Sequence, residues 1–152
     1  MPVTSRAKSK KSAKPTESTP IHVVERKSVP KDWGYEFWVV NTPQYCGKLL
    51  VMSEGWQSSL HYHTIKDETM LVLDGSAVME LKPEGVEGPS EFIAMRASER
   101  SSVRIPPGMI HRLSTSMGES VVIAEFSTTH SEDDVTRYEY SGPLYESRHN
   151  TD

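Results

Sequence analysis

From Ile21 to Ser127 the chain alternates short apolar runs with polar, turn-forming segments. Runs such as YEFWVV, GKLLVMS, TMLVLDGSAVMEL and SVVIAEFST are rich in β-branched, aliphatic and aromatic residues, a composition typical of strands. Segments such as NTPQ, KPEGVEGPS and SMGES separate them and supply turn residues. Before Thr128 no stretch has a helical period. The pattern predicts an all-β chain of about eight or nine short antiparallel strands.

Strands of this kind must close on themselves or stack in two layers to hide their edges, so a β-barrel or double-sheet jelly roll is expected. Asp74-Gly75, with apolar residues on both sides, predicts a tight hairpin. Ser131, followed by two aspartates, predicts a single helical turn near the end of the chain. The 152 residues suffice for one domain. We expect that domain at residues 21–152, with its core at about 30–127.

Charge is unevenly placed along the chain. The formal net charge is -4, but the low-complexity segment 1–20 carries five basic residues against Glu17. We expect this segment to be a disordered, solvated basic tail, and we expect no nucleic-acid partner because the tail lacks aromatic and apolar residues. Its Ser-rich, acid-poor composition leaves organelle import as an alternative.

No apolar run is long enough for a signal sequence or a membrane span, so we expect a soluble cytoplasmic protein with no membrane partner. Cys46 is the only cysteine, which excludes an internal disulfide and fits a reducing compartment. It lies in the strand-like run QYCGKLLVM, and we expect it to be a small buried residue rather than a nucleophile.

Two histidines and a glutamate crowd one strand-like segment. Residues i and i+2 of a strand face the same way, so His61 and His63 share a face. Glu68 opens the next run and can reach that face across the turn TIKD. The turn PPG at 106–108 then delivers His111 at the start of another strand. Three histidines and a glutamate suit one divalent transition metal, Mn, Fe, Zn, Ni or Co, although a His-x-His on a solvated strand face is a common alternative.

The spacing of these residues resembles the cupin superfamily. The first cupin motif, G-x5-H-x-H-x4-E-x6-G, is matched by Gly55, His61, His63, Glu68 and Gly75. The second motif is matched by Pro106, Gly108 and His111, with Arg100 in place of its first glycine and Thr115 in place of its asparagine. The resemblance implies a cupin-type β-barrel with a metal ion held by His61, His63, Glu68 and His111.

Shorter segments resemble sugar-isomerase cupins. KDWGYE, PPGMIHRLS and SEDDVTRYEYSG are similar to segments of type II mannose-6-phosphate isomerases. HYHTIKDE is similar to a string of D-lyxose isomerase-type cupins, which places Lys66 beside the metal. Together these segments favour a carbohydrate ligand, either a sugar or a sugar phosphate.

Aldose–ketose isomerisation needs a metal that polarises the carbonyl and a group that carries a proton between two carbons. We expect Lys66, with its pKa lowered by desolvation near a cation, or Glu125, a lone carboxylate in an apolar run, to carry the proton. Trp33 and Tyr35 are candidates to contact the sugar, although core packing is an equal alternative. Arg112 is a candidate to hold a phosphate or hydroxyl, although its strand neighbour His111 should point to the opposite face.

Two other functions stay open at this point. The same ligands with iron suit an oxygen-using dioxygenase, and a cupin can also bind a sugar as a sensor or regulatory module without chemistry. We further expect a homodimer, with the runs IHVVE and YEFWVV as candidate contacts between edge strands.

Overall fold

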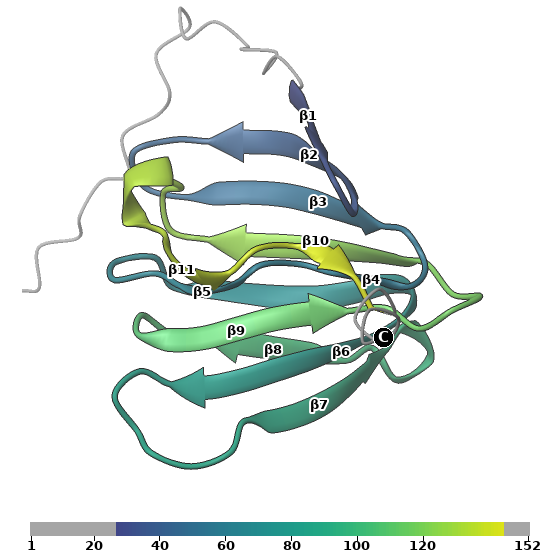
Figure 1. Ribbon diagram of the computed structural model, residues 1–152. Helices are drawn as coiled ribbons and strands as arrows, with labels where there is room; N and C mark the ends of the chain where they lie inside the picture. Colours follow the sequence, from purple (N-terminus) through teal and green to yellow (C-terminus); the bar gives the residue numbers. More distant parts are fainter. Residues whose placement is uncertain (1–26, 145–152) are drawn as a thin grey trace, which may run out of the picture.

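The computed structural model describes residues 27–144, which form twelve strands and two short 3-10 helices (Figure 1). The first strands are β1 (Lys27–Lys31), β2 (Gly34–Asn41), β3 (Cys46–Met52), β4 (Trp56–Gln57), β5 (Leu60–Tyr62) and β6 (Glu68–Pro83). The later ones are β7 (Glu91–Arg96), β8 (Ser102–Ile105), β9 (Met109–Ser114), β10 (Val121–Ser127), β11 (Thr136–Glu139) and β12 (Gly142–Pro143). The helices are η1 (Ala97–Glu99) and η2 (Glu132–Asp134). The prediction of an all-β chain is confirmed.

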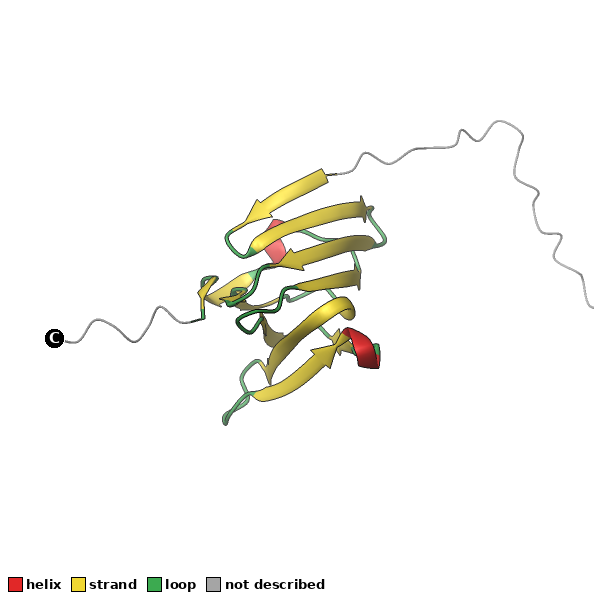
Figure 2. Cartoon of the chain, turned by 90° about the vertical axis from the view of Figure 1, so that its right-hand side faces the viewer, coloured by secondary structure: helices red, strands yellow, loops and turns green. Residues whose placement is uncertain are grey.

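All strand pairs are antiparallel, and the sheet curls around a common interior (Figure 2). On one side the order is β1-β2-β3-β10-β6, and β8 pairs with the first half of β6. On the other side the second half of β6 pairs with β7 and β9, and β9 contacts β4 and β5. The last two strands close this side, β11 on β5 and β12 on β4. The long strand β6 therefore belongs to both sides of the fold.

The hairpin predicted at Asp74-Gly75 is wrong. β6 continues through both residues, and its pairing with β10 shifts register between Val122 and Ile123. Gly75 has a φ of +72°, and a Cβ there would lie 2.0 Å from the carbonyl oxygen of Ser120. The glycine thus permits a close backbone approach where β6 bends from one side of the fold to the other. Glycine within a strand often marks such a site instead of a hairpin turn.

The interior is divided between an apolar core and a polar cavity. Alternation along β3 points Cys46, Lys48, Leu50 and Met52 inward, and the residues between them are less buried. Cys46 is buried, as predicted. The apolar core includes side chains that are fully shielded from solvent: Met52, Met79, Met95, Ile105 and Ile123. Each contributes on the order of 1.5–3 kcal/mol by its burial.

The turn predicted before His111 is present. Met109 N donates to Pro106 O at 3.2 Å, and Gly108 has a φ of +79°. The predicted helical turn is also present as η2, where the Ser131 side chain accepts a hydrogen bond from Asp133 N at 3.3 Å.

The predicted tail at 1–20 and the run IHVVE lie outside the described residues. Within residues 27–144, neither helix has the length and hydropathy that a membrane-crossing segment needs.

Candidate metal centre and cavity

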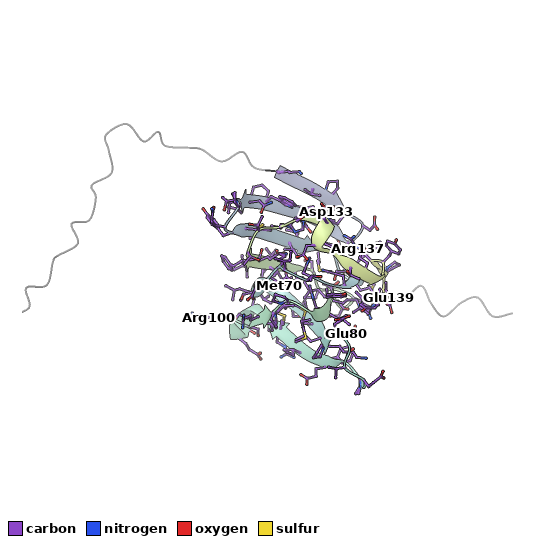
Figure 3. The ribbon with its side chains drawn as sticks, turned by 90° about the vertical axis from the view of Figure 1, so that its left-hand side faces the viewer. Met70, Glu80, Arg100, Asp133, Arg137 and Glu139 are labelled. Atoms are coloured by element: carbon purple, nitrogen blue, oxygen red, sulfur yellow. The ribbon has the colours of Figure 1, made fainter. Side chains whose placement is uncertain are left out.

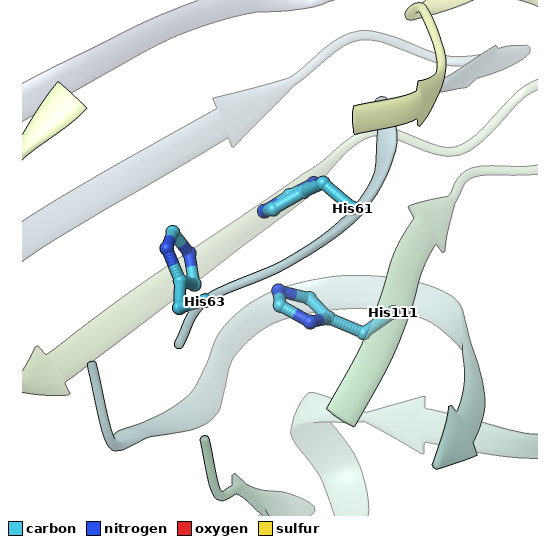
Figure 4. Close-up of side chains that lie close together, drawn as sticks. All are labelled: His61, His63 and His111. Atoms are coloured by element: carbon cyan, nitrogen blue, oxygen red, sulfur yellow. The ribbon is translucent and has the colours of Figure 1, made fainter. Parts of the chain in front are cut away.

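Three histidine side chains converge inside the fold (Figure 4). His61 lies on β5, His63 directly follows that strand, and His111 lies on β9, paired in register with His61. One ring nitrogen from each lies within 4.8 Å of the other two, so the group could hold a metal ion. The sequence-predicted histidines are therefore brought together by two adjacent strands.

The orientation of each imidazole is fixed by its Nδ1 atom. Each Nδ1 lies within hydrogen-bonding distance of a backbone carbonyl: Ser59 O at 3.0 Å for His61, Asp134 O at 2.7 Å for His63, and Met109 O at 2.8 Å for His111. A carbonyl only accepts, so Nδ1 carries the proton and a neutral ring has its lone pair on Nε2. Backbone partners of this kind orient metal-binding histidines in proteins.

Glu68 lies beside the histidines at the start of β6. Its Oε1 is 2.8 Å from Nε2 of His111 and 3.9 Å from Nε2 of His63. Oε1 of Glu68 and Nε2 of His111 are both buried without a hydrogen-bond partner among residues 27–144. The two atoms face each other, so either a proton or a metal ion between them would satisfy both. The three histidines form the group that could hold a metal, and Glu68 lies beside that group, in contact with His111 and near His63. Imidazoles with a neighbouring carboxylate suit a divalent transition metal, and Glu68 as the fourth ligand stays a prediction.

Protonation states also favour metal binding. Burial, reinforced by the neighbouring His111, lowers the pKa of His61 to about 3, and burial lowers the pKa of His63 below its ordinary value. Burial alone would raise the pKa of Glu68, but contact with His111 and the charge of Lys66 outweigh it and lower that pKa. At neutral pH the rings of His61 and His63 are neutral and Glu68 is ionised, as metal coordination requires.

Lys66 does not have the lowered pKa that we expected. Its Nζ donates to Oε2 of Glu68 at 2.6 Å and also to Oε1 of Glu125, and its side chain is only 3% exposed. Burial lowers the pKa of Lys66, but the charges of Glu125 and Glu68 outweigh it and raise that pKa above its ordinary value. Lys66 is therefore held as an ammonium between two carboxylates, and it fixes the second oxygen of Glu68.

A cavity of about 190 Å³ adjoins the histidines and is lined by Lys66, Glu125 and Trp33. Tyr35 and Arg112 are not among its lining residues. Tyr35 alternates with inward-facing Glu36 along β2 and is 43% exposed. The Arg112 guanidinium contacts Glu80 at 2.7 Å and Glu139 at 2.6 Å, on the face of β9 opposite to His111. The structure thus brings Trp33 to the cavity and places Tyr35 and Arg112 elsewhere.

Sequence reasoning missed the role of Asp134. Its carboxylate accepts hydrogen bonds from the backbone N–H groups of Thr64, Ile65 and Lys66, at 2.9, 3.0 and 2.8 Å, and its carbonyl accepts from His63. Asp134 belongs to the segment 131–139, called here the C-terminal strap, which Figure 3 shows through its residues Asp133, Arg137 and Glu139. From the sequence, the segment EDD indicated only a helical turn. No local pattern shows that one of its aspartates accepts hydrogen bonds from a loop about 70 residues earlier in the chain.

The comparisons with known proteins bear on the fold. Neither a family model nor a curated protein matches the chain. Among solved structures, the capsular polysaccharide assembling protein CapF from Staphylococcus aureus matches 77% of this chain with a TM-score of 0.69 and 17% identity. Oxalate decarboxylase from Bacillus subtilis matches 75% with a TM-score of 0.62 and 16% identity. Lactobacillus farciminis oxalate decarboxylase, solved as a formate complex, matches 75% with a TM-score of 0.61 and 16% identity.

These likenesses, together with the curled antiparallel sheet, show that the chain has the cupin fold. The aligned part covers 32%, 30% and 34% of the three solved chains, so this protein spans about a third of their length. A fold shared at this level of identity does not carry an activity with it. The group of three histidines, on this fold, supports a metal-binding cupin.

Proposed function

We propose that this protein is a metal-dependent cupin that interconverts the aldose and ketose forms of a sugar or sugar phosphate. The observation that carries the proposal is the pair of unpartnered buried atoms, Glu68 Oε1 and His111 Nε2, beside a cavity that also holds a lysine–glutamate pair. A divalent metal held by His61, His63, Glu68 and His111 would supply a Lewis acid that polarises a substrate carbonyl.

The cavity residues of this chain supply the proton chemistry that isomerisation requires. Lys66 is held protonated, so it acts as a donor that stabilises negative charge on a substrate oxygen rather than as a base. Glu125 is the candidate base: Lys66 and Ser127 both contact its Oε1, which leaves Oε2 to accept a proton. Ser58 and Ser59 also line the cavity, and polar residues of this kind suit the hydroxyl groups of a sugar.

The size of the cavity and the names of the structurally similar proteins agree with a small, oxygen-rich substrate. Its volume of about 190 Å³ is below the roughly 300–1,000 Å³ of pockets that take drug-sized ligands. One solved neighbour is named for assembling a capsular polysaccharide, and another for decarboxylating oxalate. A cytoplasmic homodimer remains part of this proposal.

The test is metal-dependent exchange of deuterium from heavy water into C2 of aldoses and C1 of ketoses, with free sugars and their phosphates as substrates. The proposal predicts exchange that chelation abolishes and that Glu125→Gln lowers by at least about 100-fold. Absence of exchange from every sugar by the metal-loaded protein would overturn it. Oxygen consumption with ferrous iron would instead support a dioxygenase.

A second function, binding without chemistry, is favoured by one observation. Lys66 is engaged by two carboxylates and is not poised to exchange its proton. A sensor or binding cupin would retain sugar affinity that depends on the metal, and would show no deuterium exchange.

A further inference from the structure

Lys48 is a buried lysine with too few partners. Its side chain points from β3 into the interior and is 1% exposed. Its Nζ is 3.4 Å from Oε2 of Glu36. Among residues 27–144, Glu36 is the one carboxylate within ion-pair distance of this ammonium. An ammonium has three N–H donors, so two of them remain for another acceptor. Buried lysines are rarely left with N–H donors that have no acceptor, because burying unsatisfied donors of a charged group is costly.

The Glu36 carboxylate is also shared with other groups. Lys31 Nζ lies 3.5 Å from its Oε1, and Trp38 Nε1 donates to its Oε2 at 2.8 Å. Burial would raise the pKa of Glu36, but Lys48 and the other donors outweigh it and lower that pKa. The ammonium groups of Lys48 and Lys27 lie 4.2 and 4.9 Å from the centre of the Trp38 ring. Lys31 and Lys48 therefore share the carboxylate of Glu36, which also accepts from Trp38, so Glu36 does not satisfy Lys48 alone.

His130 adds a second unsatisfied group to the same cavity. Its Nε2 contacts Oε1 of Glu132 at 3.0 Å, so the ring donates there and its Nδ1 is an acceptor. Nδ1 is buried and has no hydrogen-bond partner among the described residues. Burial lowers the pKa of His130, so the ring is neutral at pH 7. Both Lys48 and His130 line the cavity, which makes this corner suited to a ligand with an anionic group and a hydroxyl.

The charge of the whole cavity favours the same ligand. The lining contains four cationic and four carboxylate side chains: Lys31, Lys48, Lys66 and Arg137, with Glu36, Glu68, Glu125 and Glu132. These charges cancel, so a divalent ion at the histidines gives the cavity an excess of about two positive charges. In register, Lys48 pairs with Glu125, and Glu125 pairs with Met70 of β6. The order of these strands is β3, β10, β6, so the backbone that carries Lys48 lies two strand spacings, roughly 10 Å, from the strand that carries Glu68. A small phosphorylated or carboxylated sugar can span a distance of this order.

We propose that Lys48, assisted by Lys31, binds the phosphate or carboxylate group of an anionic ligand whose other end reaches the metal centre. This subsite rests on the proposed function for the identity of the ligand as a sugar, and it narrows the substrate class to acidic sugars. Neutral sugars would offer no anionic acceptor to the N–H groups of Lys48 that Glu36 does not take, and would bind more weakly.

The experiment is calorimetric titration of the metal-loaded full chain with inorganic phosphate, acetate and mannose. We expect an anion to bind and Lys48→Met to weaken that binding by at least about tenfold, because a charged hydrogen bond is lost. The matched control is Lys27→Met, which removes an ammonium near the same tryptophan but outside the cavity lining, and it should leave anion binding unchanged. Metal content should be equal in all three proteins. Stronger binding of phosphate than acetate would identify the group as phosphate, and the reverse as carboxylate.

Equal anion affinity in wild type and Lys48→Met would overturn the proposal, because the anion would then bind the metal or another surface. Failure of the wild type to bind either anion would also overturn it. If Lys48→Met does not fold, Lys31→Met decides in its place, since the Lys31 side chain is 29% exposed and its loss leaves the core intact. Anion binding that depends on Lys48 without deuterium exchange would refute the isomerase and keep the subsite.

Discussion

Oε1 of Glu68 and Nε2 of His111 lie 2.8 Å apart in the interior, and neither has a hydrogen-bond partner among residues 27–144. The Nδ1 proton of His111 is directed to Met109 O, so a neutral ring presents a lone pair to the carboxylate. Two acceptors at this separation repel unless a proton or a metal ion lies between them. Metal binding to this pair should therefore displace a proton and strengthen as the pH rises.

Replacing Asp134 should weaken metal binding although Asp134 is not itself a ligand. Its carbonyl orients His63 and its carboxylate holds the backbone of the Thr64–Lys66 turn. We expect Asp134→Ala to lower metal affinity by about 10–100-fold, as loss of groups that orient ligands does. Competition with a chelator measures it, and Asp133→Ala, in the same helical turn, is the control. Equal affinities in the two variants would show that the C-terminal strap does not position the ligands.

Acid should destabilise the metal-free protein before its carboxylates titrate. The folded pKa of His61 is about 3 and that of His63 is lowered, whereas unfolded histidine titrates near 6.5. The unfolded chain therefore takes up protons first, so stability falls as the pH drops below about 6.5, by up to about 1.4 kcal/mol per pH unit for each histidine. Urea unfolding of chelator-treated protein at pH 7 and pH 5 measures this loss. His61→Gln should show a smaller loss, and an equal loss would remove His61 as its cause.

Removing Lys66 should destabilise the fold through the carboxylates left behind. Lys66→Met leaves Glu68 and Glu125 buried without their shared cation, which should lower the free energy of unfolding by about 3–5 kcal/mol. The double variant Lys66→Met/Glu125→Gln removes one of the two charges and should recover part of the loss. Urea unfolding at pH 7 compares the three proteins. A double variant less stable than the single variant would show that repulsion between the carboxylates is not the cause.

The sequence predicted the positions of those site residues that a single strand or a single turn determines. His61 and His63 share a strand face, and the turn at 106–108 places His111 next to them. Glu68 opens the adjacent long strand, so its position follows from the same local rules. Contacts between distant segments were missed, because Asp134 and His63, or Lys48 and Glu36, meet only after the sheet has curled.

Glycine and lysine show why local patterns mislead. Gly75 was expected in a hairpin, but it lies where the backbone of Ser120, just before β10, comes too close for any side chain. Lys66 lies in a polar turn, but Asp134 ties that turn inward and two carboxylates keep the lysine charged. In both cases the deciding group comes from a strand or segment about 45 to 70 residues away in the chain.

Replacing Arg100 by glycine should stabilise the protein. Arg100 has a φ of +53°, a left-handed conformation that costs a residue with a side chain roughly 1–2 kcal/mol. Glycine removes that cost, but its greater freedom in the unfolded chain opposes folding by about 0.5–1 kcal/mol. The difference predicts that Arg100→Gly raises the free energy of unfolding by up to about 1 kcal/mol. The control Glu99→Gly, at ordinary φ, should lower it. Thermal unfolding compares them, and a loss of stability in Arg100→Gly would contradict the strain argument.

The most direct measurement is the metal content of the purified chain after incubation with divalent transition metals, determined by mass spectrometry of the ions. We predict one divalent ion per chain in the wild type and in His130→Ala, whose ring lies outside the group of three histidines. His111→Ala should lose the ion, because it removes the ligand that faces Glu68. A wild type that takes up no divalent ion, or a His111→Ala variant that keeps a full complement, would contradict the metal centre on which the proposed function rests.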